Sequence, residues 1–190
     1  MTPKILAFAG STRSDSFNKK LIKVAAQGAS ELGADVTVID LRDFAMPLYD
    51  GDLESQQGLP SAAVKLKELM FTHQGFLIAS PEYNSSISGV LKNTIDWTSR
   101  QSKGESPLAC YKNKVAGLMS ASPGGLGGLR GLVHVRAILE NMGVLVIPDQ
   151  IAISQAHEAF DTDNFMKDKK QEQKVKNIGI KLAETLRKLN

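Results

Sequence analysis

Five short apolar runs are spread along the chain, and each is nearly continuous rather than alternating with polar residues. Continuous apolar runs of this length are typical of parallel strands that are buried on both faces of a sheet. The runs therefore predict five parallel strands, at residues 5–9, 36–39, 75–79, 115–119 and 143–147.

Between these runs the apolar side chains recur at the spacing of an amphipathic helix, as in Phe17, Leu21 and Val24. The predicted helices cover residues 16–32, 59–73, 89–100, 132–142 and 175–189. Regular alternation of strands and helices predicts a doubly wound α/β sheet with right-handed crossovers. Because no linker, repeat or low-complexity segment interrupts the alternation, we expect one domain, residues 1–190.

The composition is that of an ordinary globular protein, because 42% of the 190 residues are hydrophobic and 23% are charged. The net charge of +3 is small and the basic residues are spread out except near the C-terminal end, so nucleic-acid binding is not expected. No signal peptide or run of membrane-span length is evident, so we expect a cytoplasmic protein without a membrane partner. Cys110 is the only cysteine and the histidines lack metal-ligand spacing, so we expect no disulfide and no metal site.

A polar loop follows the first predicted strand and leads into the first predicted helix. It contains one arginine, Arg13, and the hydroxyls of Ser11, Thr12, Ser14 and Ser16. A helix N-terminus directs unpaired N–H groups and the positive end of its dipole at one point, where a phosphate is stabilised. The loop therefore suggests a phosphate site. The alternative is a simple polar loop in which Ser16 caps the helix.

Three polar or glycine-rich loops follow the first, third and fourth predicted strands, at residues 10–18, 80–89 and 120–131. Ligands of doubly wound sheets bind beyond the carboxyl ends of the strands, where the strand order reverses, so these positions strengthen the phosphate hypothesis. The dinucleotide fingerprint and the P-loop signature are both absent after the first strand. We therefore interpret Asp40 as a turn acid and the glycines of residues 124–131 as a close backbone approach to a flat ligand.

Three motifs in these loops are GSTR followed by SFN within residues 10–18, PEYN at residues 81–84 and GVLKNTIDW at residues 89–97. Together they resemble the NADPH-dependent FMN reductase family, which includes quinone, chromate and azo-dye reductases. The resemblance implies a flavodoxin-like, five-stranded parallel sheet in the order 2-1-3-4-5 with helices on both faces. It extends from the first strand to the helix after the fourth, and the remaining residues contain no motif that we can align.

The resemblance also implies which residues bind FMN. The side chains expected on the phosphate oxygens are those of Ser11, Arg13, Ser16 and Asn18. The backbone groups expected to complete this phosphate cup are those of Thr12 and Phe17. The residues expected against the polar edge of the flavin ring are Glu82, Tyr83, Asn84 and Ser85, with Pro81 fixing the entry of their loop. The residues expected on the other side of the ring are Ser122, Gly124 and Gly125.

The activity implied by the resemblance is a two-electron transfer, in which hydride passes from NADPH or NADH to FMN and then to a small electron acceptor. Quinones are the first choice of acceptor because they are flat and electron-poor, and azo compounds, chromate and free flavin are the alternatives. No side chain is predicted as an acid, base or nucleophile, since the flavin carries the chemistry. The rival hypotheses are a non-enzymatic FMN-binding electron carrier and a nucleotide-binding protein without a redox role.

The family further implies a homodimer or homotetramer whose active-site cleft is shared at an interface. An apolar loop at residues 44–49 needs cover, which a partner or the chain itself could provide. Tyr83 could pack on a neighbouring subunit, and Glu82 could pair with a base such as Arg100 across an interface. Trp97 is interpreted as a packing residue or a dimer contact.

Overall fold

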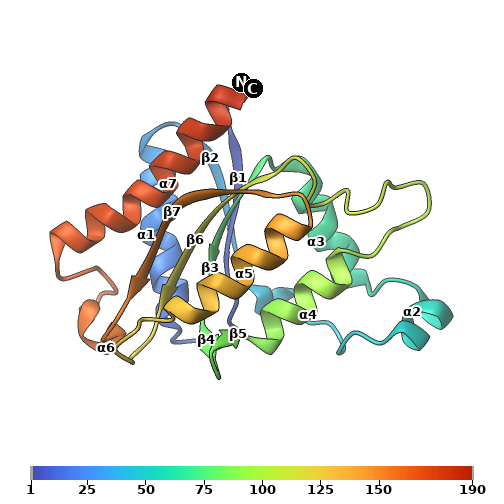
Figure 1. Ribbon diagram of the computed structural model, residues 1–190, viewed down its shortest axis with the longest axis horizontal. Helices are drawn as coiled ribbons and strands as arrows, with labels where there is room; N and C mark the ends of the chain where they lie inside the picture. The colour runs from blue at the N-terminus through green and yellow to red at the C-terminus, as the bar shows by residue number, and fades with distance from the viewer. Residues whose placement is uncertain (1, 190) are drawn as a thin grey trace.

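Five parallel strands form the sheet at the centre of the molecule. The computed structural model describes residues 2–189. The strands lie in the order β2-β1-β3-β6-β7, which confirms the predicted topology (Figure 1). Their bounds are β1 (Lys4–Ala9), β2 (Asp35–Ile39), β3 (Gly75–Ala79), β6 (Val115–Ala121) and β7 (Leu145–Ile153).

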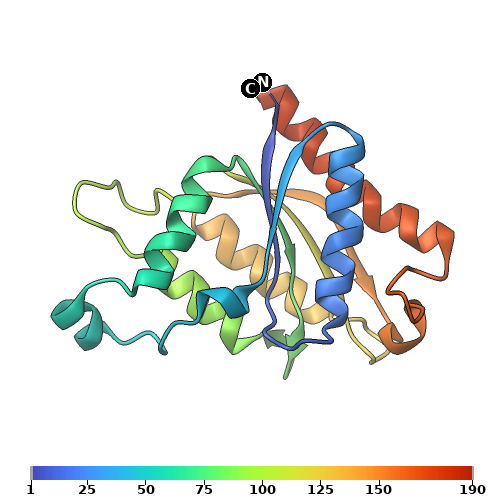
Figure 2. The same cartoon turned by 180° about the vertical axis from the view of Figure 1, so that it is seen from behind.

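Helices cover both faces of this sheet (Figures 1 and 2). The helices on one face are α1 (Phe17–Glu31) and α7 (Lys169–Leu189). Those on the other face are α3 (Ser61–Thr72), α4 (Gly89–Thr98) and α5 (Leu129–Asn141). Three shorter helices lie in the connections, and these are η1 (Leu41–Phe44), α2 (Gly51–Gln57) and α6 (Ala156–Ala159). Within residues 2–189, no helix combines the length and the apolar character that crossing a membrane requires.

Alternate residues of each central strand enter two separate hydrophobic cores. In β1, Ile5 and Ala7 pack beneath α1 and α7, whereas Leu6 and Phe8 pack beneath the helices of the opposite face. All four side chains are buried. A strand that is buried on both faces has no polar positions to alternate with, which explains the continuous apolar runs of the sequence.

The C-terminal helix α7 packs directly on α1, although its sequence contains no family motif. A Cβ atom at Gly179 would lie 2.0 Å from the carbonyl oxygen of Ala25, and one at Gly28 would lie 2.3 Å from that of Lys176. No side chain fits at either position without moving a helix backbone. The two glycines therefore allow the backbones of α1 and α7 to touch.

The last strand differs from its predicted span of residues 143–147. It runs from Leu145 to Ile153, and its pairing with β6 shifts register between Ala116 and Leu118. Arg136 of α5 supports the irregular part by donating a hydrogen bond of 2.9 Å to the carbonyl oxygen of Ile147. The apolar pattern underestimates this strand because proline and polar residues occupy its middle.

The apolar loop of residues 44–49 is covered in part by the chain itself. The carbonyl oxygen of Pro47 accepts hydrogen bonds from Trp97 Nε1 and Asn93 Nδ2, both at 2.8 Å. The Trp97 side chain is completely buried, so it is a packing residue within this chain. Leu48, at the tip of the loop, remains 81% exposed.

Candidate functional site

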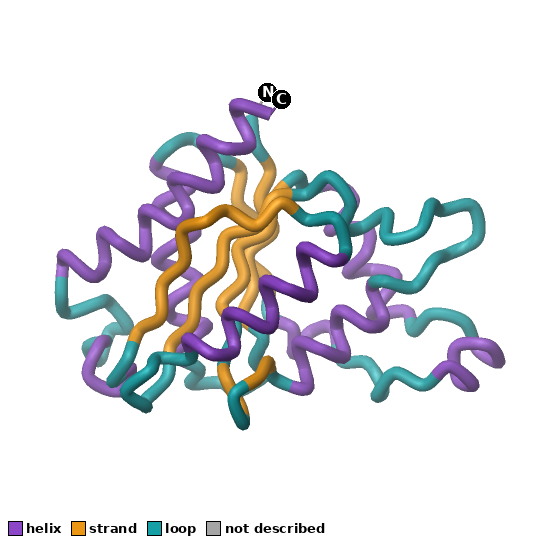
Figure 3. Tube along the Cα trace, in the orientation of Figure 1, coloured by secondary structure: helices purple, strands orange, loops and turns teal. Residues whose placement is uncertain are grey.

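Three loops meet at the carboxyl edge of the sheet, beyond the point where the strand order reverses between β1 and β3 (Figure 3). They enclose a hollow of about 150 Å³, which we call the three-loop hollow. The predicted site residues that line it are Ser11, Arg13, Ser16, Phe17, Asn18, Pro81, Glu82, Tyr83 and Ser122. The structure thus brings together residues from all three of the loops that the sequence singles out.

The remaining predicted residues lie outside the three-loop hollow. Thr12 lines a neighbouring hollow of about 300 Å³. Asn84 and Ser85 form the tip of a hairpin after β3. Gly124 and Gly125 lie in the loop after β6, where an added Cβ would meet open space at Gly125 and only one atom, 3.7 Å away, at Gly124. Contact of these residues with FMN stays a prediction.

The N-terminus of α1 has no side-chain cap. Ser16 occupies the N-cap position, but its hydroxyl makes no capping hydrogen bond and the first turn contains no acidic residue. By contrast, Asp50 caps α2 and Ser88 caps α4. The unpaired N–H groups of α1 and the positive end of its dipole therefore remain available to an anion.

Arg13 is the cation of the loop that precedes α1. The neighbouring acid, Asp15, pairs with Lys20 at 2.6 Å. No ion pair within residues 2–189 includes Arg13, which is exposed and lines both hollows. Its guanidinium is thus free to bind two oxygens of one phosphate group.

Arg42, in η1, braces this loop from the side of β2. Its Nε donates to the carbonyl oxygen of Thr12 at 3.0 Å, and its Nη2 donates to the same oxygen and to Ser14 Oγ. Asp40 accepts from the backbone N–H of Arg42 and pairs with Lys19 of α1 at 2.5 Å, so it is a turn acid, as predicted. The sequence carries no signal for Arg42, because its contact joins residues 30 positions apart outside any motif.

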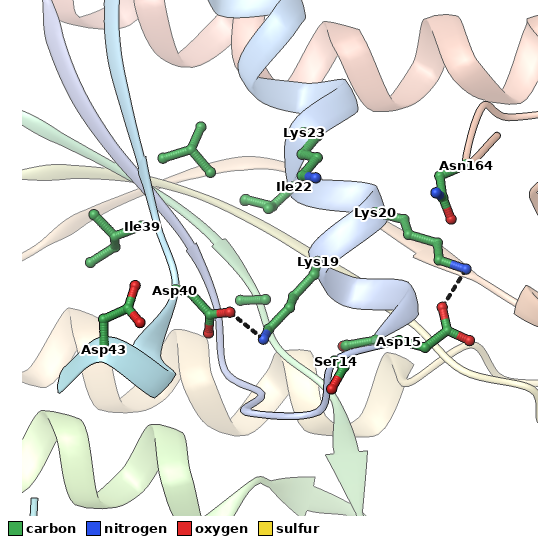
Figure 4. Close-up of a pocket in the computed structure, with 13 residues that line it drawn as sticks. Ser14, Asp15, Lys19, Lys20, Ile22, Lys23, Ile39, Asp40, Asp43 and Asn164 are labelled. Carbon is green, nitrogen blue, oxygen red and sulfur yellow. Dashed lines mark hydrogen bonds and ion pairs between the residues drawn. The ribbon is translucent and has the colours of Figure 1, made fainter. Parts of the chain in front are cut away.

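A larger groove, of about 660 Å³, lies between α1 and β2 (Figure 4). Two ion pairs occupy its walls, Lys19 with Asp40 and Lys20 with Asp15. These pairs hold the start of α1 against η1 and the preceding loop. Both lysines are thus engaged within the chain, and Arg13 is left without an ionic partner in the part of the chain that the structure describes.

Asn18 ties the start of α1 to the end of β6. Its Nδ2 donates to the carbonyl oxygen of Ala121 at 2.9 Å, and its Oδ1 accepts from the N–H of the same residue at 3.0 Å. The side chain is buried, with 3% exposure. It fixes two of the three loops relative to each other. The amide keeps a second N–H, so its contact with a phosphate stays a prediction.

A tight hairpin follows β3, formed by β4 (Glu82–Tyr83) and β5 (Ser86–Ile87). Its two turn residues, Asn84 and Ser85, have φ values of 50° and 65°. Positive φ at both central residues characterises the type I′ turn, which suits a two-residue hairpin loop. The sequence does not predict this hairpin, because its strands are only two residues long and its turn lacks glycine. The Tyr83 side chain is 52% exposed.

The carboxylate of Glu82 binds the first turn of α5. Its Oε1 accepts from Arg130 Nε at 2.9 Å and Nη2 at 2.7 Å, and its Oε2 accepts from the N–H of Gly131 at 3.1 Å. Glu82 thus pairs with Arg130, whereas Arg100 donates to the hydroxyl of Tyr49; a pairing of Glu82 with Arg100 across an interface stays a prediction. The pair that forms lies within one chain.

These bonds decide the ionisation of Glu82. Burial by itself would raise the pKa of the carboxyl group, but the hydrogen bonds from Gly131 and Arg130 outweigh burial and hold the pKa below its usual value of 4.5. The carboxylate is thus charged at neutral pH. Its stabilising contribution is complete above about pH 4.5 and is lost as the pH falls through the lowered pKa.

The glycine-rich segment after β6 has two different uses. An added Cβ would lie 2.6 Å from a backbone atom of Ile153 at Gly127 and 1.9 Å from Ser120 Oγ at Gly128, and both glycines have positive φ. These two positions serve packing of the chain on itself, which corrects their interpretation as an approach to a flat ligand. The open glycines at residues 124–125 keep that interpretation.

Comparison with known proteins identifies the family. The sequence pattern of the NADPH-dependent FMN reductases matches residues 3–158. The chain belongs to this family. It is an oxidoreductase that uses FMN and NAD(P)H, and its fold is flavodoxin-like.

Relatives of this FMN reductase extend over nearly the whole chain. A probable NADPH:quinone oxidoreductase of rice (Oryza sativa subsp. japonica) is 33% identical, over 94% of this chain and 86% of its own. An NAD(P)H-dependent FMN reductase of Pseudomonas aeruginosa is 34% identical, over 88% of this chain and 86% of its own. Among solved structures, the flavoenzyme FerB, an NAD(P)H:acceptor oxidoreductase of Paracoccus denitrificans, is 27% identical with a TM-score of 0.81, and 98% of each chain is covered.

The histidines of the reductase have structural partners. His73 is buried, with Nε2 at 2.9 Å from Thr37 Oγ1, and His134 Nδ1 lies 2.9 Å from Ser86 Oγ. Across residues 2–189, no group of three or more His, Cys, Asp and Glu side chains is arranged to hold a metal ion.

We expect Arg42→Ala to weaken FMN binding by roughly threefold to tenfold, because the carbonyl oxygen of Thr12 loses the donor that fixes it and the loop that we expect to bind the phosphate is less well held. The measurement is the dissociation constant from titration of the FMN-free protein by flavin fluorescence. Asp43→Ala, in the same short helix, is the control and should leave the constant unchanged. An unchanged constant for Arg42→Ala would show that the loop does not need the brace.

Proposed function

We propose that the three-loop hollow binds FMN, with the phosphate against the loop that precedes α1 and the flavin ring against the loops after β3 and β6. The observation that carries the proposal is the uncapped N-terminus of α1 beside the unpaired Arg13. A phosphate monoester with close to two negative charges complements both features. The open space at Gly124 and Gly125 also suits a flat ring that approaches the backbone.

Each predicted residue has a place in this proposal. Ser11, Arg13 and Ser16 donate to the phosphate with the second N–H of Asn18, and the backbone of Thr12 and Phe17 completes the cup. The residues that face the polar edge of the ring with backbone groups are Glu82, Tyr83, Asn84 and Ser85, after the rigid entry at Pro81. The residues on the other side of the ring are Ser122, Gly124 and Gly125.

In the proposed reaction, the chain binds and orients FMN and stabilises the charge that develops on its ring. Bound FMN supplies the redox chemistry, because it accepts a hydride from a nicotinamide and reduces an acceptor. Backbone N–H groups of the loop after β6 would stabilise the negative charge that reduction places on the ring, because preorganised donors stabilise such charge. No side chain is assigned as an acid, base or nucleophile.

Quinones are the acceptors that we propose, with NADPH or NADH as the reductant. The rice relative is named as an NADPH:quinone oxidoreductase, and an Escherichia coli relative, 33% identical over 76% of this chain, is named as a quinone reductase. A quinone is flat enough to stack on the ring face that the nicotinamide leaves. These relatives are enzymes, which disfavours a non-enzymatic electron carrier.

A homodimer or homotetramer is part of the proposal. Exposed apolar side chains gather on the first turns of α5 and the loop before it, where Leu126, Leu129 and Val133 are 53%, 44% and 59% exposed. Tyr83 lies on the adjoining hairpin. An apolar patch of this kind favours cover by a second copy. Light scattering of the purified protein measures the oligomeric state directly.

The deciding experiment is anaerobic addition of NADPH, and separately of NADH, to the FMN-loaded protein. We expect rapid loss of the flavin absorption band, followed by its return when a quinone such as benzoquinone is added. Colour that persists with both nucleotides would defeat the reductase and favour the electron carrier. If the purified protein neither contains nor binds flavin, the reductase and the electron carrier are both excluded. A nucleotide-binding protein without a redox role would then remain.

A further inference from the structure

Glu82 belongs to two parts of the site at once. Its backbone forms the first strand of the β4–β5 hairpin, and its carboxylate lies at the N-terminus of α5. That helix has Gly128 as its N-cap, without a side-chain cap and without an acid in its first turn. The carboxylate of Glu82 therefore takes the place of the missing cap and supplies the negative charge that a helix N-terminus favours.

The hairpin sits directly on this turn of α5. An added Cβ at Gly131 would lie 3.3 Å from Glu82 Cβ, so glycine is what allows the two backbones to approach. The second strand of the hairpin is attached to the same helix, because Ser86 Oγ lies 2.9 Å from His134 Nδ1. Any shift of α5 therefore moves both strands of the hairpin.

The contact pairs one negative side chain with one positive side chain, and the two differ in their exposure to solvent. The side chain of Glu82 is 8% exposed, whereas that of its partner Arg130 is 59% exposed. Without the carboxylate, the guanidinium and the positive end of the α5 dipole would remain beside the hairpin without a negative partner. Reduction adds negative charge to a flavin, so an uncompensated positive charge nearby favours the reduced state.

We infer that Glu82 and Arg130 form a positioning pair, which holds the hairpin against α5 and sets the midpoint potential of FMN bound beside it. The inference rests on the proposed function, because it requires the flavin ring to lie against the hairpin. Glu82 lowers the potential, Arg130 raises it, and the two effects largely offset each other in the intact pair.

The test compares Glu82→Gln, Arg130→Gln and the double variant with the unmodified protein. Glu140→Gln is the matched control, because it removes the same charge from the other end of α5, where Glu140 pairs with Arg136 at 3.5 Å. The midpoint potential of bound FMN is measured by anaerobic dye titration. Dissociation constants for FMN and for riboflavin are measured by fluorescence.

We expect a more positive potential for Glu82→Gln, a more negative one for Arg130→Gln, and a value near the original for the double variant and for Glu140→Gln. Glu82→Gln should also weaken FMN and riboflavin by the same factor, roughly fivefold or more, because the hairpin contacts the ring and not the phosphate. A merely structural role would not shift the potential in opposite directions for the two single variants.

Two results would overturn the inference while leaving the proposed function intact. In the first, the unmodified protein binds FMN, but the midpoint potential of bound FMN is the same in all four variants. The other is a shift for Glu140→Gln as large as that for Glu82→Gln, which would make net charge the cause. If Glu82→Gln does not fold, Arg130→Gln and the control Glu140→Gln still carry the comparison, because a potential for Arg130→Gln that is not more negative than that of the unmodified protein would overturn the inference. Failure of the unmodified protein to bind flavin would instead refute the proposed function.

Discussion

We expect Arg13→Ala to lower the affinity for FMN about 10-fold to 100-fold, because the phosphate would lose a charge-assisted hydrogen bond worth about 1.5 to 3 kcal/mol. The effect is large because no neighbour replaces the lost charge. Lys19 and Lys20, the next cations along the chain, are held by Asp40 and Asp15. The measurement is the dissociation constant of FMN for the FMN-free protein.

Riboflavin separates the phosphate from the ring in this experiment, since it carries the ring alone. Its dissociation constant should be the same for Arg13→Ala and the unmodified protein. Lys23→Ala removes an exposed positive charge from α1 and should change neither constant by more than about twofold at moderate salt. Equal weakening of FMN and riboflavin by Arg13→Ala would place Arg13 at the ring, and no weakening at all would remove it from the site.

We expect Trp97→Ala to lower the free energy of unfolding by about 3 to 5 kcal/mol, the range for loss of a large buried aromatic side chain. The indole is completely buried, and the ring of Tyr49 stands edge-on to it at 5.0 Å between centroids. The variant also removes one of the two donors to the carbonyl oxygen of Pro47. Urea denaturation of the FMN-free protein, followed by circular dichroism, gives the difference.

A second variant, Trp97→Phe, separates packing from hydrogen bonding. It keeps most of the aromatic volume but loses the N–H, so we expect a loss nearer 1 to 2 kcal/mol, about the value of one hydrogen bond with a small packing defect. Phe165→Ala is the control, since that ring is 65% exposed and its removal should cost about 0.5 kcal/mol or less. Equal losses for Phe165→Ala and Trp97→Ala would show that burial of the indole contributes nothing.

The layers of the fold can be predicted from the sequence, because a parallel strand that is buried on both faces appears in the sequence as a continuous apolar run. β1 and β3 contain no polar residue beyond Lys4, and the structure places them at the predicted positions. The full length of β7 is not predicted, because Pro148, Asp149 and Gln150 interrupt the apolar run in its middle. There the pairing with β6 shifts register, and Arg136 donates a hydrogen bond to the strand. A hydrogen bond from a helix side chain to the backbone of β7 thus supports the part of the strand that the apolar pattern does not predict.

The site is predictable to the level of loops but not of contacts. Strand order reversal is a property of topology, so the meeting of the three loops can be foreseen. A loop side chain can bind the ligand or contact the rest of the protein, and the choice depends on partners that are far away in the sequence. Arg42 reaches Thr12, Glu82 reaches Arg130, and the packing at Gly128 is set by Ser120. None of these pairs has a spacing or motif that reveals it.

The backbone contact of α1 and α7 at Gly28 and Gly179 affects where this protein can be truncated or fused to another. The family pattern ends at residue 158, yet α7 begins eleven residues later and lies backbone to backbone against α1, the helix whose first turn faces the proposed phosphate site. A truncation guided by sequence similarity would remove α7, uncover part of one face of the sheet and expose apolar side chains that favour aggregation. Fusion partners therefore belong beyond α7, whose last residue, Leu189, is 62% exposed, and the boundary of a family pattern is not a safe place to end the chain.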